Sequence, residues 1–219
     1  MLTSGLFMGK RYNTLYADGH SETVEKKSRF IARCARVKNE DEALGFIAEV
    51  KAAHKTASHN VYAYSLRENN LCRYSDDGEP QGTAGLPVLD ILKRGDIVDA
   101  AIVVTRYFGG TLLGTGGLVR AYSEAASLAV KDARIAVMDS CSVYRIECEY
   151  PVYDKLQKLL ENAGATVDTS SFSDIITLET AILSADAAGM IADISELTRG
   201  RTIPQHICDK FDCTEIKEI

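Results

Sequence analysis

The sequence predicts an α+β protein made of two domains, and three observations lead to this fold class. The chain has 219 residues, which suits one large domain or two small ones. Apolar residues make up 46% of the chain and charged residues 26%, the balance that is typical of a globular protein. Short apolar runs alternate with amphipathic helical patterns, and this alternation starts again after residue 140.

In the first half, residues 30–37 alternate apolar and basic side chains, a pattern that predicts a half-buried strand. A helix follows over residues 41–54, with Asn39 as its N-cap. The pair Asn69 and Asn70 marks a turn between two hairpin strands. The other predicted elements are strands at 61–66, 71–74 and 100–104, an irregular loop at 75–85, a short helix at 86–92 ended by Gly95, and a long helix from residue 118.

Composition changes at residues 137–140, and there we place the boundary between a domain at 1–138 and a domain at 139–219. The second domain is predicted to contain a strand at 141–148, a helix ended by Gly164, strands at 166–172 and 175–183, a helix ended by Gly200, and a last strand near 202–211. The resulting order, βαββαβ, is that of the ferredoxin-like arrangement.

The net charge of −6 is unevenly distributed. Residues 1–139 hold 18 basic and 17 acidic side chains, whereas residues 140–219 hold 7 and 14. A nucleic acid is therefore expected to meet only the first domain, through a local basic cluster. One cluster exists, which we interpret as the charge that protects a solvated edge strand rather than as a binding surface. It comprises Lys26, Lys27, Arg29, Arg33, Arg36 and Lys38.

No segment approaches the ~18 apolar residues that a membrane span needs. The six cysteines and four histidines form no zinc-binding pattern, and no Cys-x-x-Cys pair occurs. We therefore expect a cytoplasmic protein with reduced thiols, without membrane contact and without a cofactor.

The most informative segment runs from the strand at 100–104 through five glycines into a helix. Glycines in such a place let the backbone turn sharply and let another group approach it closely. Amides at the helix start favour a bound anion, and flanking arginines add charge. A tight turn that only packs the helix on the sheet is the alternative, and both stay open. The predicted anion-binding residues are Arg106, Tyr107, Gly109, Gly110, Gly114, Thr115, Gly116, Gly117 and Arg120.

Upstream residues form a second, accessory group. Asp76, Asp77 and Glu79 offer carboxylates that would suit Mg²⁺, although an Asx-turn with solvated acids is the simpler interpretation. His59 and Asn60 precede a predicted strand, but the sequence places no nucleophile beside the imidazole. The glycine loop matches neither a P-loop nor a dinucleotide-binding fingerprint. No catalytic residue is predicted.

Three motifs resemble the signature of the IMPACT family, which includes the bacterial YigZ-type proteins. They are Thr-Arg-Tyr-Phe-Gly-Gly at 105–110 with Leu-Val-Arg-Ala-Tyr-Ser at 118–123, Ser-His-Asn at 58–60, and Ser-Asp-Asp-Gly-Glu-Pro at 75–80. The resemblance implies a first domain with the ribosomal protein S5 domain 2-like fold. It also implies a ferredoxin-like second domain that is similar to the last domain of elongation factor G.

The same resemblance implies a regulatory role linked to translation. RNA, the ribosome or a protein partner in translation would then bind through the glycine loop. The S5-like fold also occurs in small-molecule kinases, and their phosphate loop is similar to this one. The alternative is therefore an Mg²⁺-dependent enzyme that binds a nucleotide or transfers a phosphoryl group.

Overall fold

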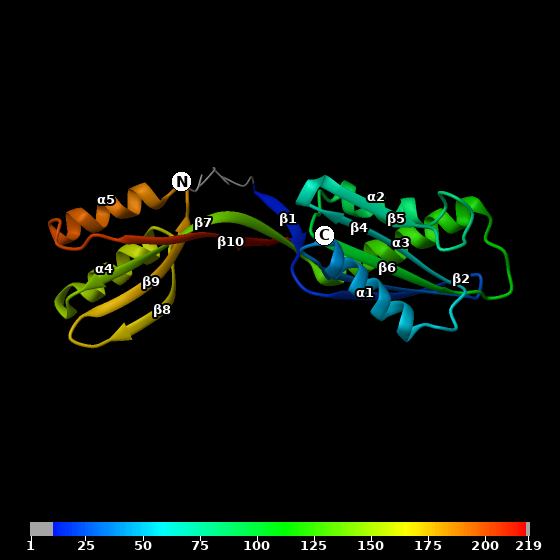
Figure 1. Cartoon of the computed structure of the whole chain (residues 1–219), viewed down its shortest axis with the longest axis horizontal. Helices are drawn as coiled ribbons and strands as arrows, with labels where there is room; N and C mark the ends of the chain where they lie inside the picture. The colour runs from blue at the N-terminus through cyan, green and yellow to red at the C-terminus, as the bar shows by residue number, and fades with distance from the viewer. Residues whose placement is uncertain (1–10, 218–219) are drawn as a thin grey trace. The chain divides into compact units, whose positions relative to one another are not determined.

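The computed structural model describes residues 11–217, which divide into two compact units (Figure 1). The N-terminal unit contains residues 12–138 together with 214–217, and the C-terminal unit contains residue 11 together with 139–213. Helices and strands follow one another in both units, which confirms the predicted α+β class. Within residues 11–217, no helix has the length and apolar character that crossing a membrane requires.

A five-stranded sheet in the order β2-β3-β6-β4-β5 forms the centre of the N-terminal unit, and its strand pairs are antiparallel. The middle strand is buried over residues 100–106, as expected of a strand that is covered on both faces. The strands are β2 (Gly19–Glu25), β3 (Ser28–Arg36), β4 (His59–Leu66), β5 (Leu71–Ser75) and β6 (Ala100–Tyr107).

Helices cover both faces of this sheet. On one face, α2 (Gly85–Arg94) and α3 (Thr115–Ala133) enclose the larger core with alternate residues of β3 and β6. On the other face, α1 (Glu40–Ala53) packs through Ile47 against Tyr64 of β4. Alternate residues of a strand point to opposite faces, so each strand contributes to both cores.

Helix ends and turns in this unit follow the local sequence. Asn39 Oδ1 accepts the amide of Glu42 at 2.8 Å, which confirms the predicted N-cap of α1. Helix α2 ends at Gly95 as predicted. A short 3₁₀ turn, η1 (Glu68–Asn70), joins β4 to β5, and both of its asparagines have positive φ. Asparagine tolerates this left-handed backbone better than most residues, which is why the pair signals a turn.

The C-terminal unit contains the predicted βαββαβ order of elements. Strand β9 pairs with β7 and with β8, and β10 also pairs with β7. Leu156 of α4 and Ile194 of α5 share one core with Ile146 and Leu178 of the sheet, so both helices cover the same face. The elements are β7 (Ile135–Cys148), α4 (Tyr150–Asn162), β8 (Thr166–Phe172), β9 (Ile176–Leu183), α5 (Ala187–Thr198) and β10 (Gln205–Lys217).

Two strands at the start of the chain were not predicted. β1 (Tyr12–Leu15) is only four residues long and pairs with residues 135–138 of β7. β2 lies at the edge of its sheet and is largely polar, so it lacks the apolar alternation that marks a half-buried strand. Strand β7 also begins earlier than predicted and runs without a break through residues 137–140.

The interpretation of the basic cluster as an edge strand was wrong. β3 is an inner strand, paired by β2 on one side and by β6 on the other. Its cations are balanced across the surface instead, because Arg29 pairs with Glu22 and Arg33 pairs with Glu49. Lys27 is not on the strand at all, since it lies with positive φ in the turn that joins β2 to β3.

Candidate anion-binding site

The loop between β6 and α3 is held against the turn between β2 and β3. A side chain at Gly109 would overlap the backbone of Lys27, so only glycine permits this approach. The hydroxyl of Ser28 accepts the amide of Gly109 at 3.1 Å. The exposed turn residues Lys26 and Lys27 therefore lie beside the glycine loop. Sequence reasoning did not connect these two segments, because they are some 80 residues apart along the chain.

Helix α3 begins without a capping side chain. Its N-cap, Gly114, has a φ of 75°, a value that strongly favours glycine. The amide of Leu118 donates the first hydrogen bond of the helix, to the carbonyl of Gly114 at 3.0 Å. The amides of Thr115, Gly116 and Gly117 precede it and have no acceptor within the helix. Gly114, Thr115 and Gly116 are exposed, so a dissolved anion can reach this turn.

Arg120 lies on the same helix and turns back toward its start. Helical side chains tilt toward the N-terminus, and Arg120 Nη1 lies 3.9 Å from the position that a Cβ of Gly116 would take. Arg120 is exposed. A cation near a helix N-terminus is opposed by the helix dipole, and a bound anion would turn that repulsion into attraction. The side chain of Arg120 thus lies beside the start of α3.

Arg106 is not the free cation that its place beside the loop suggests. Only 5% of it is exposed, and its Nη1 donates to Glu79 Oε1 at 2.6 Å. Its Nη2 donates to the hydroxyl of Ser28 at 3.3 Å, and the guanidinium lies 5.5 Å from the ring centres of Phe30 and of Phe108. Among the described residues, Arg106 Nε is a buried donor without an acceptor.

Glu79 is the acceptor at the centre of this buried group. Its Oε1 also accepts the hydroxyl of Tyr122 at 2.7 Å, and Nε2 of His59 lies 3.8 Å away. Burial, together with the neighbouring Glu79 carboxylate, raises the pKa of Tyr122 far above its usual value, so this phenol stays protonated. The Tyr122 ring packs edge-on against Phe30 with centroids 5.1 Å apart.

His59 is oriented from the opposite side by the loop that follows β5. Its Nδ1 lies 2.8 Å from the backbone carbonyl of Asp77, which can only accept, so Nδ1 carries a proton. Asp77 also accepts the amide of Asn60 and the ammonium of Lys51. Burial works against ionisation of Asp77, but these donors outweigh it and lower the pKa of the carboxyl. Nε2 of His59 is left facing Glu79.

The third carboxylate of this segment has a structural role. Asp76 Oδ1 accepts the amides of Ala84 at 3.1 Å and Gly85 at 2.8 Å, and Oδ2 accepts that of Gly82 at 2.9 Å. Asp76 therefore caps α2, whose own N-cap position is an alanine. Asp76, Asp77 and Glu79 thus each have separate protein partners. Within residues 11–217, no group of His, Cys, Asp or Glu side chains is arranged to hold a metal ion.

A pocket of about 500 Å³ lies between the buried group and the start of α3. Its walls are largely apolar, and the exposed Leu112 and Phe108 stand at the glycine loop. His59, Arg106 and Thr115 contribute polar groups. Tyr107 does not line it, because its hydroxyl lies 2.9 Å from His54 Nδ1 beside α1. The apolar pair Leu112 and Leu113 among exposed glycines is a sequence signal for this pocket, and the predicted site residues did not include it.

Fold and site together define a class: a two-unit α+β protein whose first unit has an uncapped, glycine-lined helix start beside an apolar pocket. The sequence matches the family described as the Impact N-terminal domain over residues 26–130, and the domain of unknown function DUF1949 over 146–201. It is 35% identical to IMPACT family member YvyE of Bacillus subtilis, with 87% of this chain and 88% of that protein aligned. The chain belongs to the IMPACT family.

Two further relatives are named as IMPACT proteins, and one solved structure is similar in fold. IMPACT family member YigZ of Escherichia coli is 33% identical over 80% of this chain and 87% of that protein. The Protein IMPACT homolog of Dictyostelium discoideum is 41% identical, but over 46% of this chain and 30% of that protein. A crystal structure described as that of a hypothetical protein aligns with a TM-score of 0.58 at 30% identity, covering 91% of this chain and 98% of the other.

Proposed function

We propose that the protein is a cytoplasmic, translation-linked binding protein that holds a phosphate of ribosomal or ribosome-bound RNA at the start of α3. The observation that carries this proposal is the uncapped, exposed turn Gly114–Gly116 with the guanidinium of Arg120 folded over it. Open amides and a cation at one helix start are the donors that phosphate oxygens require. The exposed Lys26 and Lys27 extend the positive charge along the neighbouring turn.

The adjoining pocket supports RNA over a simple anion. A single-stranded nucleotide presents an apolar base face next to its phosphate, and Phe108 and Leu112 offer an exposed surface on which a base can stack. The buried guanidinium of Arg106 keeps one unpaired N–H among the groups that line this pocket. A base edge or a phosphate oxygen would supply the missing acceptor.

We also propose a fold for each of the two domains. We assign residues 1–138 to an S5 domain 2-like domain and 139–219 to a ferredoxin-like domain. For the second, β9 and β10 both pair with β7 while β8 pairs with β9, the strand order of the ferredoxin-like arrangement. Both folds occur in proteins that work with the ribosome, which supports the translation link by analogy of fold.

The enzymatic alternative has no comparable support. A phosphotransferase would need acidic side chains free to hold Mg²⁺ beside the glycine loop. Asp76 is engaged by three backbone amides, Asp77 by Lys51 and the amide of Asn60, and Glu79 by Arg106 and Tyr122. The donors around these carboxylates belong to the protein itself, so we do not put the enzyme forward.

The proposal is tested by reversing one charge at the start of α3. Arg120→Glu should weaken the binding of a fluorescent single-stranded RNA by about tenfold and lower the salt dependence of log K by about 0.7, the value for one phosphate contact. Lys131→Glu makes the same charge change at the other end of this helix, where Lys131 is exposed. Fluorescence polarisation from low to moderate salt measures both, and ribosome cosedimentation repeats the comparison on the assembled particle.

Equal losses of RNA affinity in Arg120→Glu and Lys131→Glu would show that the overall charge of the protein, and not the start of α3, determines binding. Wild-type protein that binds neither RNA nor ribosomes would remove the proposal altogether. Thermal unfolding of each variant confirms that the fold is intact, since both positions are on the surface.

A further inference from the structure

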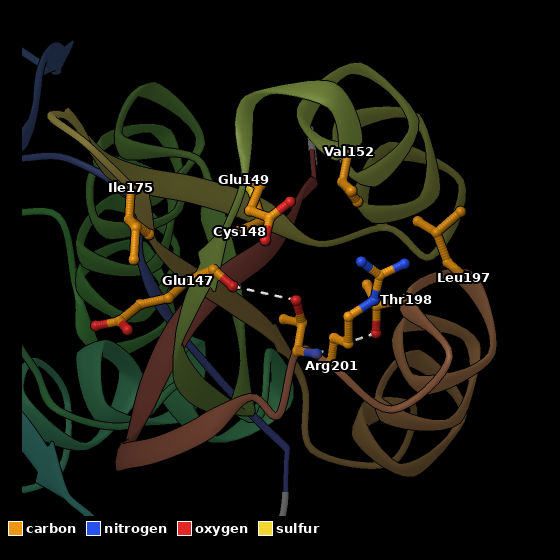
Figure 2. Close-up of a pocket in the computed structure, with 9 residues that line it drawn as sticks. Glu147, Cys148, Glu149, Val152, Ile175, Leu197, Thr198 and Arg201 are labelled. Carbon is orange, nitrogen blue, oxygen red and sulfur yellow. Dashed lines mark hydrogen bonds between the residues drawn. The ribbon is translucent and has the colours of Figure 1, made fainter.

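A second pocket lies in the C-terminal unit, between the start of α4 and the end of α5 (Figure 2). Its volume is about 220 Å³, which equals about seven waters at their liquid volume. This space suits a small metabolite of several heavy atoms rather than a nucleotide. Its side walls come from Cys148, Glu149, Val152, Ile175, Leu197 and Arg201.

The floor of this pocket is fixed by two buried threonines. Thr202 Oγ1 donates to the carbonyl of Glu147 at 3.2 Å, and Figure 2 shows this bond together with a Glu147 carboxylate that points away from the pocket. The amide of Thr202 donates to Thr198 Oγ1 at 3.2 Å, and Thr198 in turn donates to the carbonyl of Ile194 at 2.8 Å. These bonds tie the end of α5 to the end of β7, so the pocket is formed before any ligand arrives.

Three aliphatic side chains and a thiol form the apolar part of the lining. Val152 comes from the first turn of α4, Leu197 from the last turn of α5, and Ile175 from the residue before β9. Cys148 is buried, and burial raises the pKa of its thiol, which therefore stays neutral. An aliphatic group would displace water from this surface with a gain in free energy.

Two opposite charges on exposed residues, Arg201 and Glu149, lie beside the apolar part of the lining and do not pair with each other. Figure 2 shows the guanidinium of Arg201 reaching toward Val152, and the carboxylate of Glu149 turned into the same space. Within residues 11–217, neither side chain has an ion pair or a hydrogen bond, although Arg145 and Glu179 of the same unit are paired at 2.8 Å. The guanidinium of Arg201 is a cation with five donors, and because the residue is exposed, either water or an anionic ligand can be its partner.

The turn after α5 gives Arg201 this direction. Arg199 and Gly200 both have positive φ, and the amide of Gly200 donates back to the carbonyl of Ser195 at 2.8 Å. This is the way in which a left-handed pair ends a helix and reverses the chain. The reversal returns Arg201 to the side of α5 on which Leu197 and Thr198 line the pocket.

We infer that this pocket binds a free α-amino acid with an aliphatic side chain. Arg201 donates to the carboxylate, Glu149 accepts from the ammonium group, and Val152 and Leu197 contact the side chain. A zwitterion with an aliphatic side chain matches both exposed charges at once, and it fits a small pocket whose lining is about half apolar. This site shares no lining residue with the pocket at the glycine loop, so amino-acid binding can be tested independently of RNA binding.

Calorimetric titration of the full chain with L-leucine tests the inference. L-leucine should bind, and three analogues should each bind at least about tenfold more weakly because each removes one of the matched groups. Isocaproate lacks the ammonium group, isoamylamine lacks the carboxylate, and glycine lacks the aliphatic side chain. Absence of heat at millimolar L-leucine, together with absence of a thermal shift, would overturn the inference.

Two variants locate the binding within the chain. Arg201→Ala and Glu149→Gln should each weaken L-leucine binding by about tenfold or more. Lys155→Ala and Asp154→Asn are matched controls, because both residues are exposed on α4 and neither lines this pocket. If the two pocket variants bind L-leucine as well as the controls do, the site is elsewhere and the assignment is wrong.

Discussion

Arg106 Nη1 and Glu79 Oε1 lie 2.6 Å apart inside the N-terminal unit, with side chains that are 6% and 4% exposed. This ion pair joins β6 to the loop before α2, directly beneath the pocket of the candidate site. Two charges that are so deeply buried depend on each other, because either one alone would lack a partner in a medium of low polarity. Arg106 and Glu79, which the sequence suggested as ligand-binding groups, thus stabilise the structure beneath the site.

Removing one partner of this pair should be strongly destabilising. Glu79→Ala is expected to lower the free energy of unfolding by about 3–5 kcal/mol, since it leaves the Arg106 guanidinium buried and unpaired. The double variant Glu79→Leu with Arg106→Met should lose less than Glu79→Ala alone. Urea denaturation measures the free energy of unfolding of the wild type and of both variants. The surface pair of Arg145 and Glu179 is the control, and its alanine variants should change stability by about 1 kcal/mol or less.

Stability should fall at alkaline pH partly through Tyr64. Burial, and then the hydrogen bond that its hydroxyl donates to Glu40, raise the pKa of Tyr64 to about 12. An unfolded tyrosine ionises near pH 10, so between about pH 10 and 12 only the unfolded chain releases this proton. Folding stability contributed by Tyr64 is therefore complete below pH 10 and is lost as the pH rises through that window.

Tyr64→Phe should flatten this decline in urea denaturation between pH 9 and about 12. The exposed Tyr74 provides the comparison, and Tyr74→Phe should leave the slope unchanged. A slope that is the same in all three proteins would contradict the assignment to Tyr64.

Two glycines should respond oppositely to replacement by alanine. Gly109→Ala forces a methyl group into the backbone of Lys27 and should cost about 1–3 kcal/mol of stability, the range for overpacking. Gly45 lies inside α1 with open space around it, so Gly45→Ala should stabilise by about 0.5–1 kcal/mol. Thermal unfolding of both variants checks the difference in sign, and a stable Gly109→Ala protein would show that the two turns do not pack as described.

Asp76 should behave as a helix cap and not as a metal ligand. Asp76→Ala frees the amides of Gly82, Ala84 and Gly85 and should cost about 0.5–2 kcal/mol. Millimolar Mg²⁺ should leave the melting temperature of the wild type and that of the less stable variant each unchanged. A magnesium-dependent shift that is present in the wild type and lost in the variant would revive the metal site.

Local sequence was enough for most of the secondary structure. Asn39 caps α1, and Gly95 ends α2, because a cap depends on the few residues around it. The glycine-rich link from β6 to α3 was equally visible. β2 was missed because an exposed edge strand buries too little to leave an apolar alternation. The burial of Arg106 was missed because its partner Glu79 is 27 residues away in the chain.

The sequence by itself determined most of the helices and strands from β3 onward, the kinship with the IMPACT family and the glycine-rich link from β6 to α3, since these depend on short-range periodicity and on motif spacing. The tertiary structure alone decided which charged groups remain available. Arg106 is buried in an ion pair with Glu79, whereas Arg120 is exposed to solvent, although both arginines flank the same loop. Free energies of charges depend on their surroundings in space, and the chain brings those surroundings together only on folding.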